Sequence, residues 1–215
     1  DEDNNPKFED LYGAPIAKSG DSYYTHYLAA NRVTSPMNHF REPRFYAYLA
    51  FDGNLYYGQD ALSDAARKEL KLEIFHGNMA RTTTTGYNPK KMVNYLRTIT
   101  GSTVLNQYRY PFPVIRLADL YLMYAEAANE AYGPNIDIYY YLNLIRERAG
   151  LKTVQEAWQQ HSRYPDKYMS QDGLREIIRR ERTIELSFEG SRFWDLRRWK
   201  TAHFELNQQL KGWYI

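Results

Sequence analysis

The stretch that decides the fold runs from Pro113 to Glu130 and reads PVIRLADLYLMYAEAANE. Its apolar residues return every three or four positions, which is the spacing of one face of an α-helix. Pro113 opens this helix and Gly133-Pro134 stops it, so the sequence predicts a helix from Val114 to Tyr132. The predicted face consists of Leu117, Leu120, Tyr121, Tyr124, Ala125, Ala128 and Ala131.

A second helix is predicted from Asp137 to Ala149, with Asp137 as its cap and Gly150 as its stop. Only a few residues separate it from the first helix. So short a connection folds the second helix back along the first, which makes an antiparallel helical hairpin. Its predicted apolar face consists of Ile138, Tyr141, Leu142, Ile145 and Ala149.

The same arrangement returns further along the chain. A third helix is predicted to end at Gly190, and a fourth runs from Ser191, its cap, to about Phe204. The residues between the two hairpins, Leu151 to Met169, have no clean period and are predicted as a loop. Two hairpins in tandem indicate a mainly α fold of tetratricopeptide-like helical hairpins carrying long loops. The third helix has an apolar face of Leu174, Ile177, Ile178, Ile184 and Phe188, and the fourth has Phe193, Leu196, Trp199 and His203 along one side.

Before residue 114 the pattern changes to short runs broken by turn residues. Asp52-Gly53 lies between the runs Phe45–Phe51 and Asn54–Tyr57, which predicts a β-hairpin. We therefore expect residues 1–113 to form a loop-rich segment with minor β-hairpin content and residues 114–215 to form the helical-hairpin region. Together they are expected to make one domain, and the apolar finish at Gly212–Ile215 suggests a fragment of a longer chain.

Composition excludes several function classes. Lys plus Arg number 28 and Asp plus Glu number 26, so a net charge of +2 gives no reason to expect nucleic acid as a partner. The chain has no cysteine, which excludes disulfides, Cys-ligated zinc and a thiol nucleophile. The five histidines show no metal-ligand spacing, and we expect no metal and no cofactor.

Glu181 and Glu185 lie four residues apart on the third helix, as a catalytic carboxylate pair or half of a carboxylate metal site would. No histidine follows either glutamate at the third position, whereas arginines are plentiful nearby. Buried carboxylates need partners, and guanidinium groups supply them. We therefore expect no catalytic residue here, and instead structural ion pairs that lock the last two helices together. The expected members are Glu181, Glu185, Arg182, Arg192 and Arg197.

Aromatic residues are abundant on the irregular segments, since the chain has 21 Tyr, 9 Phe and 4 Trp. The C–H faces of sugar rings settle on aromatic rings, while neighbouring amide and charged groups bond the hydroxyls. Each ring has the alternative role of packing a loop onto a helix. The candidate ligand-binding residues are Tyr23, Tyr24, Tyr27, Asn31, Arg32, Tyr56, Tyr57, Gln59, Trp158 and Gln159.

Three stretches of the second half form one pattern: residues 113–130, LNLIRERAGL at Leu142–Leu151, and IRRERTIELSFEGSRFWDLRRW at Ile178–Trp199. This pattern resembles the SusD/RagB family of outer-membrane nutrient-binding lipoproteins. The resemblance implies a surface-exposed outer-membrane lipoprotein, held by a lipid anchor outside this chain. It also implies that the protein hands its ligand to a SusC-like TonB-dependent transporter.

The resulting hypothesis is non-catalytic binding of nutrient oligosaccharides for delivery to that transporter. Peptide or protein nutrients, as for the RagB kind, are one alternative. A helical-repeat scaffold for protein partners is another, and a glycosidase would need a carboxylate pair in an open cleft.

Overall fold

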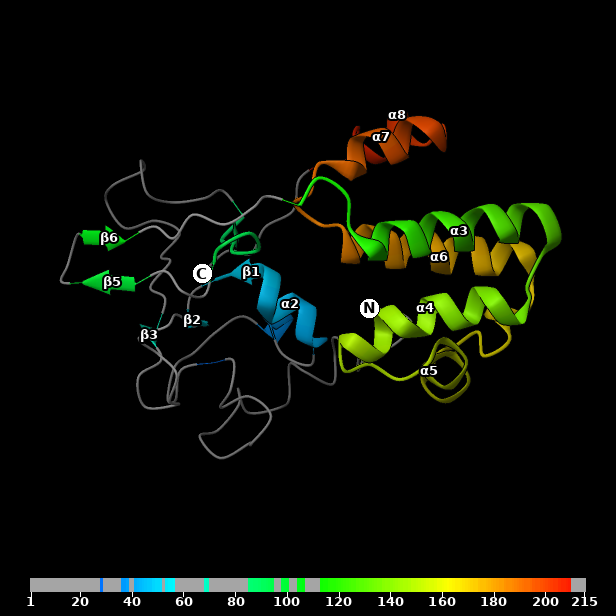
Figure 1. The fold of residues 1–215 in the computed structure, drawn as a ribbon, viewed down its shortest axis with the longest axis horizontal. Helices are drawn as coiled ribbons and strands as arrows, with labels where there is room; N and C mark the ends of the chain where they lie inside the picture. Colours follow the sequence, from blue (N-terminus) through cyan, green and yellow to red (C-terminus); the bar gives the residue numbers. More distant parts are fainter. Residues whose placement is uncertain are drawn as a thin grey trace. The chain divides into compact units, whose positions relative to one another are not determined.

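The computed structural model describes residues 28, 36–38, 41–51, 53–56, 68–69, 85–94, 98–100, 104–106 and 113–209. These residues fall into two compact units. The first, called the helical unit, comprises Glu42–Arg44 and Pro113–Gln208, and the second contains the described residues of Phe45–Phe112 together with Leu28, residues 36–38 and Arg41. Figure 1 shows the helices of the first unit and the short strands of the second.

The helical unit begins with the predicted hairpin, formed by α3 (Leu117–Tyr132) and α4 (Ile136–Arg148). Asn135 caps α4, because its side chain accepts hydrogen bonds from the backbone N–H groups of Asp137 and Ile138. The cap therefore lies two residues earlier than predicted. Gly133 allows the tight connection, since its φ of 74° is one that residues with a Cβ rarely adopt.

The predicted loop between the hairpins is wrong in its first part, because α5 (Val154–His161) is a helix. A capping box starts it: the Thr153 side chain accepts from the Glu156 N–H, and the Glu156 side chain accepts from the Thr153 N–H. Val154, Ala157 and Trp158 are buried on one side of this helix. The 3₁₀ turn η6 (Lys167–Met169) then leads into α6.

Helix α6 (Gln171–Glu185) begins at Ser170, whose side chain accepts from the Gly173 N–H. The predicted fourth helix is two shorter ones, α7 (Ser191–Arg198) and α8 (Ala202–Glu205). The backbone leaves the helical conformation between them, at Lys200 with a φ of 59°. Gly190, and not Ser191, occupies the cap position of α7.

The core of the helical unit lies between α3, α4, α5 and α6, and α3 packs against both α4 and α6. The predicted apolar face of α3 is wrong in part. Ala125 and Ala128 are buried and Tyr121 packs against the core, but Leu117, Leu120 and Tyr124 are 60%, 48% and 46% exposed. The buried face of α3 includes the small residues Ala118 and Ala125, and small side chains let a neighbouring helix approach closely. Each large apolar side chain buried here contributes about 1.5–3 kcal/mol. Those with no exposure are Leu122, Ile138, Leu142, Val154, Leu174 and Ile178.

The second unit has little regular structure among its described residues. Helix α2 (Pro43–Tyr48) starts in the helical unit and continues into this one, and the 3₁₀ turn η2 covers Pro36–Asn38. The antiparallel strand pairs are β1 (Leu49–Ala50) with β4 (Asn88–Pro89), β2 (Leu55–Tyr56) with β3 (Lys68–Glu69), and β5 (Thr98–Thr100) with β6 (Val104–Asn106).

The mainly helical fold with minor β-hairpin content is confirmed, and β5 and β6, which are close in the sequence, pair antiparallel. The hairpin predicted around Asp52-Gly53 is wrong, because β1 and β2 pair with later segments and not with each other. Gly53, with a φ of 80°, lies in a turn closed by a 3.1 Å hydrogen bond from the Asn54 N–H to the Phe51 carbonyl.

Candidate functional site

Glu181 and Glu185 lie on the last turns of α6, one helical turn apart, so both side chains leave the same face of the helix. Their side chains are 4% and 0% exposed. Two carboxylates so deep in a protein need charged partners, because burying an ion alone costs several kcal/mol or more. Their partners therefore decide whether this pair is available for chemistry.

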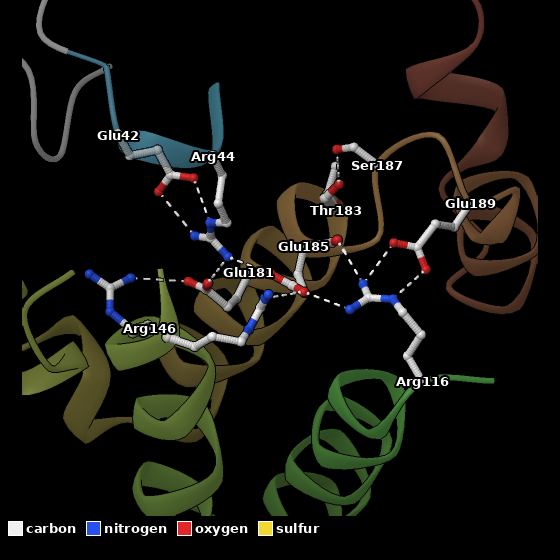
Figure 2. Close-up of polar contacts among 10 residues, drawn as sticks. Glu42, Arg44, Arg116, Arg146, Glu181, Thr183, Glu185, Ser187 and Glu189 are labelled. Atoms are coloured by element: carbon white, nitrogen blue, oxygen red, sulfur yellow. Dashed lines mark hydrogen bonds and ion pairs between the residues drawn. The ribbon is translucent and has the colours of Figure 1, made fainter. Parts of the chain in front are cut away.

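Glu181 is held by two arginines from distant parts of the chain (Figure 2). Arg44 Nη1 donates to its Oε1 at 2.6 Å, and Arg146 Nη1, from α4, donates to its Oε2 at 3.0 Å. Arg44 also forms a two-pronged pair with Glu42, at 2.8 and 3.0 Å. Each oxygen of Glu181 thus accepts one guanidinium N–H.

Glu185 is shared by three arginines. Its Oε1 accepts from Arg116 Nη1 at 3.0 Å and from Arg148 Nη2 at 2.5 Å, and its Oε2 accepts from Arg44 Nη1 at 3.2 Å. Arg116 reaches further along the chain, donating to both oxygens of Glu189 at 2.8 and 2.7 Å and to the Glu185 carbonyl at 3.1 Å. The start of α3, the end of α4 and the segment at Arg44 are all tied to the end of α6.

The electrostatics agree with this pairing. Burial by itself would lower the pKa of Arg44, but the charge of Glu181 and the hydrogen bonds to Glu42 and Glu181 outweigh it and raise the pKa. The pKa of Arg116 is raised in the same way, since the hydrogen bonds to Glu189 and Glu185 outweigh its burial. Because every oxygen of the two α6 carboxylates already accepts a guanidinium N–H, a substrate or metal would have to displace an arginine. We use the name arginine–carboxylate network for Glu181 and Glu185 together with Glu42, Glu189, Arg44, Arg116, Arg146 and Arg148.

The arginines predicted from the sequence contact other groups. Arg182 donates to Asp119 at 2.5 Å and to Asp195 at 2.7 Å, which links α6 to α3 and α7. Arg192 pairs with Glu205 at 3.2 Å and also donates to the Thr183 hydroxyl.

The Arg197 guanidinium lies 5.5 Å from the centre of the Phe193 ring. The two glutamates are instead paired with four arginines that were not predicted from the sequence: Arg44, Arg116, Arg146 and Arg148. The last two stand in the basic final turn of α4, a signal the sequence does carry.

A second charged cluster joins α3 to the region of α7. Both oxygens of Glu126 accept from Arg198 at 2.6 Å, and Trp199 Nε1 donates to the same carboxylate at 2.7 Å. Burial would raise the pKa of Glu126, but these hydrogen bonds outweigh it and lower the pKa. Arg198 also pairs with Asp195 at 2.9 Å. Like the first cluster, this one holds helices together.

Most of the predicted ligand-binding residues lie outside the described residues: Tyr23, Tyr24, Tyr27, Asn31, Arg32, Tyr57 and Gln59. For Tyr56 the structure describes only the backbone, in β2. Trp158 is 5% exposed and belongs to the core, so its ring offers little surface to a ligand. Gln159 is exposed and donates to the Tyr168 hydroxyl at 2.5 Å.

Within the part of the chain that the structure describes, no group of three or more His, Asp or Glu side chains is placed to hold a metal ion. Nor does any described helix combine the length and apolar character needed to cross a membrane.

Known proteins resemble this chain in sequence and in structure. The profile of the SusD family matches residues 5–214. Two curated relatives come from Formosa agariphila: SusD-like protein P25 is 44% identical over 86 residues, and SusD-like protein P2 is 38% identical over 89 residues. These matches cover 40% and 41% of this chain but 15% and 17% of the relatives.

Two solved structures are similar in fold. BT4246 has 27% sequence identity and a TM-score of 0.57, over 84% of this chain and 30% of that one. Selenomethionine BT4246 has 25% identity and a TM-score of 0.58, over 88% and 32%. The chain thus spans about a third of the solved structures that it matches. Because the family profile matches almost the whole sequence and the helical fold agrees, the chain belongs to the SusD family.

Proposed function

We propose that the chain binds nutrient oligosaccharides without altering them, as part of a surface-exposed outer-membrane lipoprotein that passes them to a SusC-like TonB-dependent transporter. The observation that carries the proposal is the family match over residues 5–214, because the resemblance implies nutrient capture. The membrane is reached only through a lipid anchor, and no cofactor takes part.

The non-catalytic part of the proposal is supported by the arginine–carboxylate network. A glycosidase needs one carboxyl group that gives up a proton and another that meets the sugar or a water. Glu181 and Glu185 are buried, and their oxygens accept hydrogen bonds from Arg44, Arg116, Arg146 and Arg148. The carboxylate oxygens of Glu181 and Glu185 are therefore engaged in hydrogen bonds within the protein and are not presented to a sugar.

Ligand capture is proposed for the predicted aromatic and amide residues before residue 114, for Arg32 and for Gln159. Trp158 has a different part in this proposal. Its ring packs in the core, and the Lys167 ammonium lies 5.3 Å from the ring centre, so Trp158 positions α5 and presents the exposed Gln159 next to it. Peptides are the nearest alternative ligand, since aromatic and amide side chains bind both classes.

The proposal is tested by isothermal titration calorimetry of the chain against neutral hexasaccharides of different linkage (maltohexaose, cellohexaose, laminarihexaose) and against a mixture of short peptides. We expect saturable heat with at least one hexasaccharide, weakened by Tyr24→Ala. Tyr132→Ala serves as the control, because this ring is 84% exposed on α3, outside the proposed capture residues. Saturable binding of peptides alone, or of neither class, would contradict the oligosaccharide proposal.

A further inference from the structure

Four tyrosines gather across the helical hairpin. Tyr121 and Tyr124 extend from α3, and Tyr140 and Tyr141 from α4. The ring centre of Tyr141 lies 5.0 Å from that of Tyr121, 4.8 Å from that of Tyr124 and 5.2 Å from that of Tyr140. We call these four residues the tyrosine platform.

One part of the platform is packed against the core and another part is exposed to solvent. Tyr121 is partly buried and packs against the core of the helical unit, which holds the cluster in place. Tyr124 and Tyr140 are 46% and 58% exposed. Large aromatic rings at the surface that touch one another form a ready contact area at low entropic cost, because each tyrosine has few rotatable bonds.

The hydroxyl groups separate these tyrosines from those that pack the interior. The packing tyrosines form hydrogen bonds inside the protein. The Tyr46 hydroxyl donates to the Asn38 carbonyl, the Tyr87 hydroxyl to Asn38 Oδ1, and the Tyr139 hydroxyl to the Tyr168 carbonyl. The Tyr168 hydroxyl accepts from the Gln159 side chain. Within the part of the chain that the structure describes, the platform hydroxyls have no such hydrogen bond. They can therefore donate to and accept from a ligand.

The platform is also uncharged. The charged residue one helical turn before Tyr140 and Tyr141 on α4 is Asp137, which is exposed and whose carboxylate can accept hydrogen bonds from ligand hydroxyls. Aromatic faces that carry hydroxyl groups and no net charge suit a ligand with flat C–H patches bordered by hydroxyls. Resting on the proposed function, we propose that the tyrosine platform is a second binding site for neutral oligosaccharides, built on rigid helices and separate from the capture residues before residue 114.

The test compares Tyr124→Ala and Tyr140→Ala with wild type in calorimetric titrations against maltohexaose, cellohexaose and laminarihexaose. Loss of one stacked ring should weaken binding at the platform about fivefold to tenfold. Tyr140→Phe keeps the ring and removes only the hydroxyl, so its effect should be smaller than that of Tyr140→Ala. The control is again Tyr132→Ala, on the same helix but without a ring contact to the platform. Far-UV circular dichroism checks that each variant is folded.

Ring resonances of selectively labelled tyrosine report the site directly. On titration with the hexasaccharide that binds, the signals removed by Tyr124→Ala and Tyr140→Ala should shift, and that of Tyr132 should stay in place. If wild type and both alanine variants bind equally well, the platform proposal is wrong while the proposed function stands. If wild type binds no hexasaccharide, both fail. If Tyr124→Ala instead abolishes self-association seen by sedimentation, the face is an interface between copies of the chain and the platform proposal is overturned.

Discussion

Replacing Glu185 with glutamine removes the negative charge that three arginines share, while the side chain keeps its size and shape. Glu185 has no exposed surface, and Arg44 beside it is only 4% exposed. Removing one partner from a buried ion pair costs about 3–5 kcal/mol, because the remaining charge stays buried without compensation.

The neighbouring charges place Glu185→Gln at the lower end of that range. Arg44 keeps Glu181, and Arg116 keeps Glu189. Arg148 is 57% exposed and can turn into water. We therefore expect the free energy of unfolding of the helical unit to fall by about 3 kcal/mol.

Urea unfolding followed by far-UV circular dichroism measures this loss. With a slope of about 2 kcal/mol/M, the midpoint should move down by about 1.5 M. Glu176→Gln is the matched control, because this residue lies on the same helix and is 67% exposed in its pair with Lys167. Exposed pairs contribute about 0–1 kcal/mol. A midpoint shift for Glu185→Gln no larger than that for Glu176→Gln would show that the Glu185 charge does not stabilise the buried arginines.

Three further predictions follow from single contacts. The pKa of Glu126 is lower in the folded chain than its ordinary 4.5, so the stability that its carboxylate provides is complete above pH 4.5 and falls as the pH drops through the folded pKa. Glu126→Gln loses the ion pair with Arg198. When urea midpoints are measured down to pH about 3, the midpoint of this variant should therefore fall less with decreasing pH than that of wild type. Burial lowers the pKa of Lys90 to about 8, so folding favours its neutral amine, and the stability of the second unit should rise as the pH goes from about 8 to 10.5. An NMR titration of the lysine side chains should show one midpoint near 8, absent in Lys90→Met, and a Lys90 midpoint near 10.5 would contradict this. A methyl group on Gly173 would overlap the Lys167 carbonyl oxygen, so Gly173→Ala should cost about 1–3 kcal/mol, and an unchanged urea midpoint would show that the turn before α6 can yield.

The helices of the hairpins were predictable because a buried helix face repeats its apolar residues every three to four positions. The buried face of α3 was harder to predict than the helix itself. Leu117, Leu120 and Tyr124 follow the helical period as well as the buried Ala118 and Leu122 do, and the period alone does not say which side of the helix meets a neighbour. The N-terminus of helix α5 could have been predicted from the capping-box pattern of Thr153 and Glu156. The polar composition of the helix gave no clear apolar period to support it.

The carboxylate pair on α6 could be singled out from spacing and from the nearby basic residues. Its partners could not be assigned in the same way, because they depend on tertiary packing. Arg44 lies 137 residues before Glu181 in the sequence, and no local pattern connects the two. Arg116 precedes α3 by a single residue and reaches Glu185 only because α3 packs against α6.

If the chain binds an oligosaccharide without altering it, the ligand recovered after binding is chemically unchanged. The chain is saturated with the hexasaccharide that binds, held for many hours, and separated from it, and the sugar is then examined by mass spectrometry and by an assay for new reducing ends. We expect a hexasaccharide of unchanged mass and no reducing ends beyond those of a protein-free sample. Shorter fragments that form in proportion to the amount of protein would contradict it.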